Sequence, residues 1–498
     1  MVRVLWVFHA EPHTPIPLYP YTPSPCLLGQ IQVFLIKISM KVYSFPRGGL
    51  SFDDPTVPPR NSSVAAFLPA LSVIPLVQYP GGRVSALVSV GDSVKEGMLI
   101  GRGKSPDLAN VHATVPGKVV RNVQWKDSEG RINEGFVIRM QGSFERLGKK
   151  EEKIPHEEIS FLELQRILAD CGIVDMEGSG RPIGETLSGL RGSDKRQTLV
   201  VRCVFDDPWL AADYVLCKER FQAIVEGAFI IAKAGGRVDR VIFAVSGLER
   251  DIGDAMISEA ALYDIQSSLF LTGSKYPQRN YRELELVLRN YGKKENINLG
   301  SLLVLGPATL AAVHDAVKYR RPILERYVAV GGSAVVKPQV MRVRLGKRIG
   351  DLFEECGGFS DTPFRIAVGS PFSGRIAMSL DEPVTKTSYA VFAMLKSQAG
   401  HHPERDCIGC GECRRVCPVG LDPEELYKRV IAAGRQAPEP QSRMPSFTLP
   451  QMQSQPEQEP QNPGQEECHG CGCCELVCPS SLPLSDVIMG KKRGGSNA

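Results

Sequence analysis

The pattern of hydrophobic and polar positions changes character several times along this chain. Between residues 72 and 140, short apolar runs alternate with glycine-containing turns, which is typical of the short strands of a small sandwich. From residue 198 to residue 317 the apolar runs lengthen, and a helical pattern follows each of them. Uninterrupted apolar strands that alternate with helices indicate a parallel sheet with helices on its faces.

The second region is regular enough to place its elements individually. We expect strands at residues 199–204, 238–245, 268–272 and 302–305, and helices at residues 218–233, 254–263, 282–290 and 308–317. Residues 327–353 return to a β-rich pattern with a short helix at residues 349–353, which suits a small β-grasp-like module. A last helix is expected at residues 422–432, with Pro423 in its first turn, where proline is well tolerated.

Length and charge add only broad limits. With 498 residues, the chain is long enough for roughly three or four domains, each with its own core. The formal net charge of +4 is nearly balanced for a chain of this size, and no nucleic-acid partner is expected. No stretch approaches the roughly 20 apolar residues that cross a bilayer, so we expect a chain that is soluble or peripheral to a membrane.

Two segments stand apart from this organisation. Residues 1–40 are partly proline-rich and lack the basic start and small-residue cleavage site of a signal peptide. We therefore expect that Met40 is the biological start and that residues 1–40 are an extra segment that is not translated. Residues 437–467 are rich in Pro and Gln, which predicts a disordered linker.

Eight of the fourteen cysteines form two copies of one spacing. In each copy three cysteines are separated by two residues, and a fourth follows after three more and precedes a proline. This spacing is typical of [4Fe–4S] clusters, and in two-cluster ferredoxins the fourth cysteine of each copy binds the other cluster. We expect one cluster at Cys407, Cys410, Cys413 and Cys478, and the other at Cys468, Cys471, Cys474 and Cys417.

Zinc and disulfides are the alternatives for these cysteines. Structural zinc takes two separated pairs of ligands, and disulfides across two-residue gaps would be strained, so both fit the spacing less well. Cys473 is out of step with the repeat and is expected not to be a ligand. The other cysteines have no metal spacing and are expected to be small buried hydrophobic residues: Cys26, Cys171, Cys203, Cys217 and Cys356.

Several short motifs and both cysteine sets follow one another in a characteristic order. The motifs are Phe45–Gly49, Ile74–Leu76, Val90–Asp92, Pro277, Glu325–Gly332 and Pro383–Lys386. In this order they resemble the C subunit of the Rnf complex, an ion-translocating NADH:ferredoxin oxidoreductase, from about Phe45 to the end of the chain. Each motif is weak by itself, and the ordered combination carries the resemblance.

The resemblance and the hydrophobic pattern together imply a multidomain α/β and β architecture. The expected parts are the extra segment at 1–40, a barrel-sandwich hybrid at 41–145, a Rossmann-like parallel α/β domain at 146–325, a β-grasp module of the SLBB type at 326–395, and an α-helical two-[4Fe–4S] ferredoxin-like domain at 396–498. The α/β domain is similar to the flavin subunit of respiratory complex I.

In the Rnf family a glycine-rich loop and three further segments hold FMN and nucleotide. Here the loop is residues 172–183, in which Asp175 and Glu177 replace glycines and so add bulk and negative charge where a phosphate would approach. The other segments, at residues 202–208, 276–282 and 304–309, have lost most family residues. The residues that remain as candidate FMN ligands are Gly178, Gly180, Pro182 and Asp207.

FMN is therefore a doubtful cofactor for this chain. Gly178 and Gly180 are interpreted as a turn before a helix that is retained for structural reasons. Arg181, Arg202 and Arg279 could form a new anion site, and an ion-paired or solvated surface is the simpler interpretation.

The resemblance implies an electron-transfer subunit, peripheral on the cytoplasmic face of the inner membrane, that relays electrons through two [4Fe–4S] clusters. Its expected partners are the other subunits of an Rnf-like complex, including membrane-embedded ones and a ferredoxin-like subunit, with NADH or a separate donor protein as the electron source. Family likeness favours NADH oxidation at FMN by the chain itself, whereas the pocket residues favour a donor protein. Whether the chain alone is an enzyme stays open. A non-redox docking subunit with structural clusters is the alternative from another functional class.

Overall fold

The computed structural model describes residues 41–77, 82–105, 107–126, 131–149, 152–154, 159–191, 196–235, 238–371, 374–398, 403–436 and 465–490. The chain divides after Lys41, and every element below belongs to the unit Val42–Ala498. The expected extra segment at 1–40 lies outside the described residues, as does the expected linker at 437–467 except for its last three residues.

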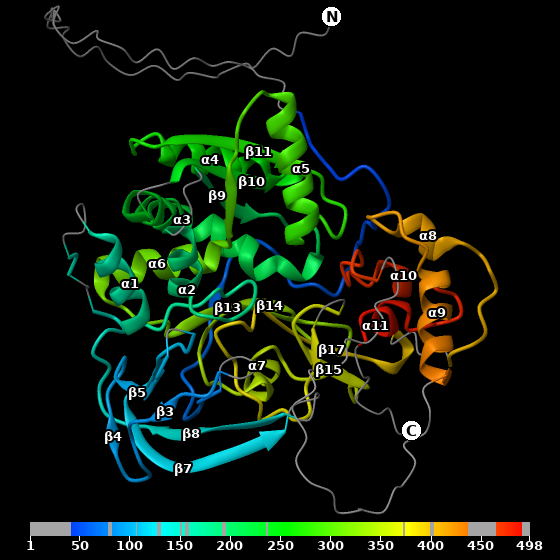
Figure 1. Cartoon of the computed structure of the whole chain (residues 1–498). Coiled ribbons are helices and arrows are strands. Elements are labelled where there is room, and N and C mark those ends of the chain that lie inside the picture. The colour runs from blue at the N-terminus through cyan, green and yellow to red at the C-terminus, as the bar shows by residue number, and fades with distance from the viewer. Residues whose placement is uncertain are drawn as a thin grey trace, which may run out of the picture. The chain divides into compact units, whose positions relative to one another are not determined.

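Two small sheets form the first β-structure (Figure 1). One has the strand order β2-β8-β7-β4 and the other the order β3-β5-β6. Their bounds are β2 (Leu71–Pro75), β3 (Ser85–Ala86), β4 (Ser93–Val94), β5 (Leu99–Arg102), β6 (Val111–His112), β7 (Gly117–Lys126) and β8 (Ile132–Met140). Inward-facing side chains such as Ile100, Val119 and Ile138 form a separate core between these strands. The apolar runs between glycine turns therefore became short strands, as predicted.

A parallel four-stranded sheet follows, in the order β11-β10-β9-β12. The strands are β9 (Gln197–Cys203), β10 (Val238–Ser246), β11 (Gln266–Thr272) and β12 (Ser301–Leu305). Helices cover both faces of the sheet, which is why the strands read as continuous apolar runs. Along β9, Leu199 and Val201 face one core, whereas Val200 faces the other.

The helices of this α/β unit divide between the two faces. α5 (Tyr281–Lys294) packs on one face through Leu284, Val287 and Leu288. The opposite core includes the remaining helices: α1 (Phe161–Asp170), α2 (Ile183–Arg191), α3 (Ala211–Gly235), α4 (Arg250–Ala260) and α6 (Pro307–Tyr319). The short turns η1 (Pro208–Leu210) and η2 (Gly247–Glu249) precede α3 and α4.

The predicted elements of this unit are all present, with shifted ends. α3 begins at Ala211, earlier than the expected residue 218, because Asp207 caps the turn η1 and the chain continues from that turn into the helix. Within α3 the backbone departs from helical geometry at Arg220, whose φ is −133° and ψ is 28°. The guanidinium of Arg220 donates to both carboxylate oxygens of Asp315 in α6, at 3.1 and 2.6 Å.

A mixed sheet with the order β1-β14-β13-β17-β15-β16 packs beside the α/β unit. Its elements are β1 (Val64–Ala65), β13 (Glu325–Gly331), β14 (Gln339–Arg344), α7 (Ile349–Glu355), β15 (Arg365–Val368), β16 (Arg375–Ile376), β17 (Ala390–Met394) and the turn η3 (Lys396–Gln398). Its core is continuous with that of the α/β unit, since Val328 and Val391 join the same cluster as Trp209. The β-grasp assignment and the domain boundaries stay predictions.

Four short helices complete the described chain: α8 (Glu412–Val416), α9 (Pro423–Gln436), α10 (Cys473–Leu476) and α11 (Leu484–Ile488). Their small core combines Leu482 and Leu484 with Cys413 and Cys474. In the part of the chain that the structure describes, no helix has both the length and the hydropathy to span a membrane.

Candidate functional site

The two cysteine loops have the same local backbone. Each contains two glycines with φ between 61° and 75°: Gly409, Gly411, Gly470 and Gly472. Glycine adopts this left-handed conformation without the steric cost that other residues meet. The turn directs the Gly409 N–H to the Cys407 sulfur, at 3.4 Å, and the Gly470 N–H to the Cys468 sulfur, at 3.5 Å. Each loop then enters a short helix, α8 or α10, that carries the third cysteine.

Cys417 lies with the second cysteine set. It lines one hollow together with Cys468, Cys471 and Cys474, and Cys473 lines this hollow as well. Its sulfur accepts a hydrogen bond from the Leu421 N–H at 3.3 Å. The structure thus brings together the four cysteines that the crossed pattern predicts for one cluster.

Cys478, in turn, lies with the first set. It packs against an apolar cluster that contains Cys413 and also Cys474 of the second set, so the hydrogen bonds beside it carry the assignment. Two hydrogen bonds join the residue pair after Cys478 to the pair before the first cysteine: Arg405 N–H donates to the Ser480 carbonyl at 3.0 Å, and the Ser480 hydroxyl donates to the Asp406 carbonyl at 2.9 Å. This arrangement supports the crossed assignment, in which Cys478 completes the first cluster.

The chemistry of these groups fits iron–sulfur clusters. Burial raises the pKa of the Cys413, Cys417 and Cys468 thiols above the ordinary value, so the thiolate form depends on a bound metal. Within the described ranges, no three His, Cys, Asp or Glu side chains converge on the position of a single metal ion. Each cysteine of a cubane binds its own iron, and backbone N–H donors to sulfur help to set the cluster potential.

The second cysteine set faces the α/β unit. The Tyr276 hydroxyl donates to the Cys471 carbonyl at 2.8 Å, and His469 pairs with the buried Glu283 of α5. Gly49 N–H donates to the carbonyl of Val416, next to Cys417, at 2.9 Å. In the first set, by contrast, two cysteines are exposed: Cys407 and Cys410.

The four segments predicted to form a flavin pocket do meet in space. Arg202 of β9 donates to the carbonyl of Glu177 at 3.2 Å and to the carbonyl of Arg279 at 3.4 Å. The Thr309 hydroxyl at the start of α6 donates to the Glu177 carboxyl group at 2.5 Å. These contacts join the loop 172–183 to the other three segments.

Charged side chains of the chain itself fill the place where these segments meet. Asp213 of α3 accepts hydrogen bonds from Arg279 and from Arg326 of β13, both at 3.2 Å. The Arg279 N–H donates to the Asp206 carboxyl group at 2.7 Å, and burial raises the pKa of Asp206 to about 7. Arg202 and Arg279 thus join an internal network and not a solvated surface, whereas Arg181 is exposed.

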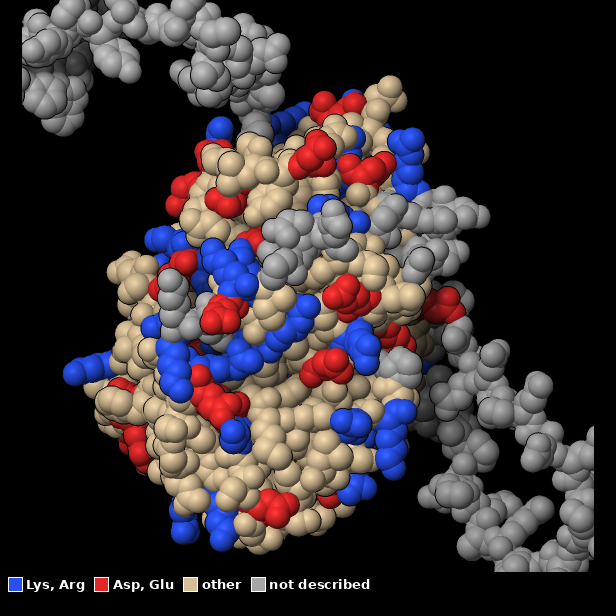
Figure 2. Space-filling view, turned by 90° about the vertical axis from the view of Figure 1, so that its left-hand side faces the viewer, with Lys and Arg blue, Asp and Glu red and all other residues tan. Residues whose placement is uncertain are grey.

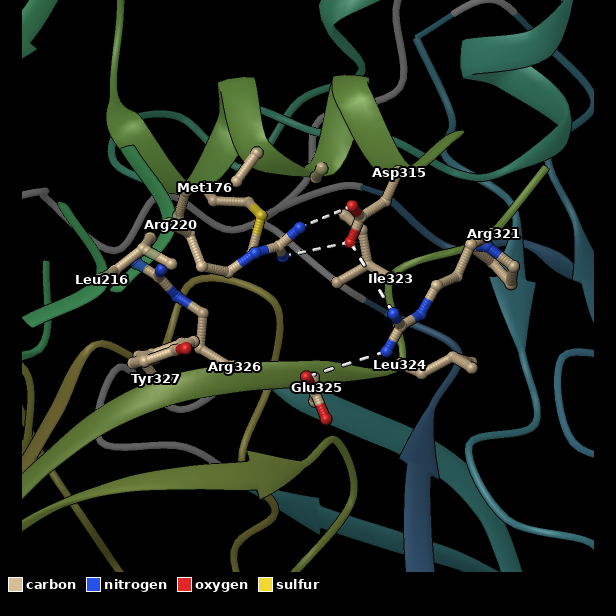
Figure 3. Close-up of a pocket in the computed structure, with 14 residues that line it drawn as sticks. Met176, Leu216, Arg220, Asp315, Arg321, Ile323, Leu324, Glu325, Arg326 and Tyr327 are labelled. Atoms are coloured by element: carbon tan, nitrogen blue, oxygen red, sulfur yellow. Dashed lines mark hydrogen bonds and ion pairs between the residues drawn. The ribbon is translucent and has the colours of Figure 1, made fainter. Parts of the chain in front are cut away.

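Little space remains beside this network. Figure 3 shows the adjoining cavity, with Met176 and Arg326 in its lining and Asp315 held between Arg220 and Arg321. The cavity measures about 50 Å³. Pockets for ligands of nucleotide size measure about 300–1,000 Å³, so the cavity has room only for a few water molecules.

The remaining candidate FMN ligands serve the local backbone. Gly180 has a φ of 72°, and its N–H donates to the Asp175 carbonyl at 3.0 Å. A Cβ at Gly178 would collide with the Asp175 carboxylate, and Pro182 forms a β-bridge with Val174. These residues therefore close a tight turn just before α2.

Asp207 has a structural role as well. Its carboxylate is buried and accepts the N–H of Trp209 at 2.9 Å, which caps the turn η1. The residues present therefore do not fit FMN: their polar groups are used within the fold, and the space is filled.

A second hollow lies between the first β-structure and the α/β unit. Its lining mixes Arg146, Arg166 and Arg320 with Glu163 and Asp170. On the face in Figure 2, Lys and Arg side chains gather near the middle, among Asp and Glu. Arg146 donates to the Tyr319 and Arg320 carbonyls, at 3.4 and 3.2 Å, and so satisfies the end of α6. This arginine therefore ties the first β-structure to the α/β unit.

Comparison with known proteins follows the same division of the chain. Three family models match: the RnfC barrel sandwich hybrid domain at residues 47–143, the Nuo51 FMN-binding domain at residues 168–314 and the 4Fe-4S dicluster domain at residues 401–479. The C subunit of an ion-translocating oxidoreductase complex from Rhodobacter capsulatus is 29% identical over 370 residues, which cover 73% of this chain and 70% of the relative. The chain resembles the C subunit of Rnf complexes.

Two further relatives extend the resemblance to other bacteria. The C subunit of a proton-translocating ferredoxin:NAD(+) oxidoreductase complex, from Clostridium ljungdahlii, is 29% identical over 76% of this chain and 83% of its own length. The C subunit of a Na(+)-translocating ferredoxin:NAD(+) oxidoreductase complex, from Acetobacterium woodii, is 26% identical over 71% of this chain and 80% of its own length. The likeness to Rnf C subunits predicted from the ordered motifs is therefore confirmed, as are the barrel-sandwich hybrid, flavin-type α/β and dicluster parts.

Sequence reasoning missed three features of these sites. It did not find that Glu177 contacts the start of α6, or that Asp213 and Arg326 complete the internal network. It noted Phe45–Gly49 as a motif and did not place it against Cys417. The two glycines of that motif were the available signal, because adjacent glycines often mark a close approach of backbone segments.

Proposed function

We propose that this chain is a peripheral electron-transfer subunit of an Rnf-like membrane complex, which relays electrons through two [4Fe–4S] clusters. The repeated loop geometry, with a glycine N–H directed at a cysteine sulfur in each copy, is the observation that carries the proposal. The two cysteine sets and the match to a dicluster domain agree with it.

The proposed relay has an inner and an outer cluster. The set with Cys417, Cys468, Cys471 and Cys474 lies against the α/β unit through Tyr276, whereas Cys407 and Cys410 are exposed. An exposed cluster allows a redox partner to approach closely. We propose that a ferredoxin-like partner exchanges electrons with the outer cluster, and that the α/β unit and the β-grasp-like module hold the subunit in the complex.

A flavin-free relay suits the α/β unit better than NADH oxidation at FMN. The internal network of Asp213, Arg279 and Arg326 uses the polar groups that a cofactor would need, and the adjoining cavity is small. Electrons would then come from a separate donor protein. The relatives act in complexes with several subunits that translocate ions, and on that basis we propose a place on the cytoplasmic face of the inner membrane beside membrane-embedded subunits.

The test is anaerobic purification of the full chain, followed by assay of iron, acid-labile sulfide and released flavin and by EPR spectroscopy after reduction. We expect about eight iron and eight sulfide per chain, two EPR signals and no flavin. Replacement of Cys417 by Ser should remove or alter the signal of one cluster, and replacement of Cys410 by Ser that of the other.

Cys473→Ser tests the ligand assignment further, because Cys473 begins α10 outside the repeat but lines the same hollow as Cys417. We expect this variant to keep both signals. Loss of the same signal in the Cys417 and Cys410 variants would contradict the crossed pattern. Clusters that a reduced ferredoxin never reduces would favour the alternative of a non-redox docking subunit, and stoichiometric FMN would contradict the flavin-free relay.

A further inference from the structure

The first N–H groups of α6 receive no capping side chain from the residues just before the helix. The residue before the helix, Gly306, has no side chain with which to cap it, and Pro307 has no N–H. The N–H groups of Ala308 and Thr309 therefore need acceptors from elsewhere, and the start of a helix attracts negative charge. Such a helix start is a common place for the phosphate of a nucleotide.

Glu177 supplies these acceptors from the loop before α2. One carboxyl oxygen accepts the Ala308 N–H, and both oxygens lie 3.3 Å from the Thr309 nitrogen. The second oxygen also accepts the Thr309 hydroxyl at 2.5 Å. A Cβ on Gly306 would overlap the Glu177 side chain, so the absence of a side chain at Gly306 makes room for the carboxyl group.

The surroundings of this carboxyl group have the character of an anion site. Arg326 is 1% exposed, and its Nε and one of its terminal nitrogens have no hydrogen-bond partner among the described residues. The Nε of Arg202 is likewise without a partner in the described part of the chain. Burial and the charge of Asp213 raise the pKa of Glu177, and the charges of Arg326 and Arg279 oppose this rise. Buried guanidinium groups with free donors are suited to phosphate oxygens.

We propose that Glu177 is a tethered substitute for a phosphate: its carboxyl group fills an anion site at the start of α6 and so closes the α/β unit to nucleotides. An internal carboxyl group at this site would explain how the chain keeps a flavin-type fold although its side chains do not fit FMN. It concerns the α/β unit alone and holds whether or not the clusters turn over.

The experiment compares the wild-type full chain with Glu177→Gly, Glu177→Gln and Asp175→Asn, all purified anaerobically with their clusters. Thermal unfolding is followed in inorganic phosphate and in NaCl of equal ionic strength. Glu177→Gly should unfold at a lower temperature in NaCl and recover in phosphate, with an affinity for phosphate at least about tenfold above that of the wild type.

The other two variants test whether a phosphate response comes from emptying the site, from loss of the charge or from a general change in the loop. Glu177→Gln keeps the shape and one acceptor oxygen, so it should resist phosphate as the wild type does. Asp175→Asn changes the other acid of the loop, whose carboxylate accepts the Ser179 N–H within the turn, and should respond to phosphate no more than the wild type does.

Several results would overturn the proposal: a folded Glu177→Gly without a phosphate response, a Glu177→Gln response equal to that of Glu177→Gly, or stoichiometric FMN in the wild type. Phosphate stabilises folded proteins in general, so the wild type should show only the gain that Asp175→Asn also shows. A saturable response of the wild type at low phosphate concentration would overturn the proposal even if Glu177→Gly does not fold. EPR spectra of the same samples report on the clusters separately, so a failure here leaves the electron relay untouched.

Discussion

Single buried charges determine how the α/β unit responds to pH. Asp206 is 4% exposed and accepts one backbone N–H, from Arg279, at 2.7 Å. Burial raises its pKa from an ordinary 3.8 to about 7. The folded chain therefore binds a proton more tightly at this position than the unfolded chain does. Its contribution to stability is complete below about pH 4 and is lost as the pH rises through 7.

Replacement of Asp206 by Asn should flatten this pH dependence. Between pH 5 and pH 8 the wild type should lose about 2–3 kcal/mol of unfolding free energy through this group, and the variant should lose correspondingly less. Urea unfolding at a series of pH values, followed by circular dichroism, gives the comparison. Asp361→Asn, at an exposed position, is the control and should follow the wild type. A variant curve parallel to the wild-type curve would exclude Asp206 as the titrating group.

At the scale of elements, the segment 45–50 joins the α/β unit to the second cysteine set. Leu50 pairs with Tyr276 through two backbone hydrogen bonds, at 2.9 and 2.7 Å. On its other side, Gly48 has a φ of 58°, and a Cβ there would lie 2.5 Å from the Val416 carbonyl and 2.6 Å from the backbone of Cys417. The glycine thus permits a backbone approach that sets the position of Cys417.

Gly48→Ala should therefore damage one cluster and spare the other. We expect loss of up to half of the iron and sulfide, together with the EPR signal that Cys417→Ser also removes. Gly91→Ala is the matched control, because Gly91 has a φ of 100° but open space around its Cβ position. Equal cluster content in the two variants would show that the close approach at Cys417 does not matter.

At the scale of the whole molecule, Lys386 lies where the first β-structure, the α/β unit and the six-stranded sheet meet. This side chain is 4% exposed, and its ammonium group donates to the carbonyl of Asn110 in the first β-structure, at 2.9 Å, and of Gly172 in the α/β unit, at 2.8 Å. Lys386 is the last residue of the motif Pro383–Lys386, in the region of the six-stranded sheet. Burial lowers the pKa of Lys386 to about 7, because the charged form of the side chain is costly to remove from water. The hydrogen bonds to the two carbonyl groups offset part of this cost.

Lys386→Met should loosen the junction of these units. Two buried carbonyl groups would lose their partner, at a cost of about 1–3 kcal/mol each. The expected result is a lower urea midpoint and faster proteolysis between the first β-structure and α1, with unchanged cluster content. Lys118→Met alters an exposed lysine of β7 and serves as the control. Wild-type resistance to protease in Lys386→Met would argue against a role at the junction.

Much of this architecture follows from local sequence. Each strand of the parallel sheet and the helices α3, α4, α5 and α6 were predicted, because burial on both faces leaves continuous apolar runs and one-sided burial leaves a helical period. The helices α1 and α2 were not predicted. The ends of α3 were predicted less well, since the turn η1 and the kink at Arg220 depend on contacts with Asp207 and Asp315. The crossed pairing of the cysteines stays a prediction, which the position of Cys417 beside Cys468, Cys471 and Cys474 supports.

The sequence alone determined the strands of the parallel sheet, four of its helices, the two cysteine sets and the loss of the family's flavin residues, because each depends on residues that are close together in the chain. Tertiary structure alone decided what replaced the flavin site. Glu177 meets Thr309 from 132 residues away, and Asp213 of α3 links Arg279, in the turn before α5, with Arg326 of β13. No local pattern specifies such pairs, because a buried charge can be satisfied by any partner that the fold brings within hydrogen-bond distance.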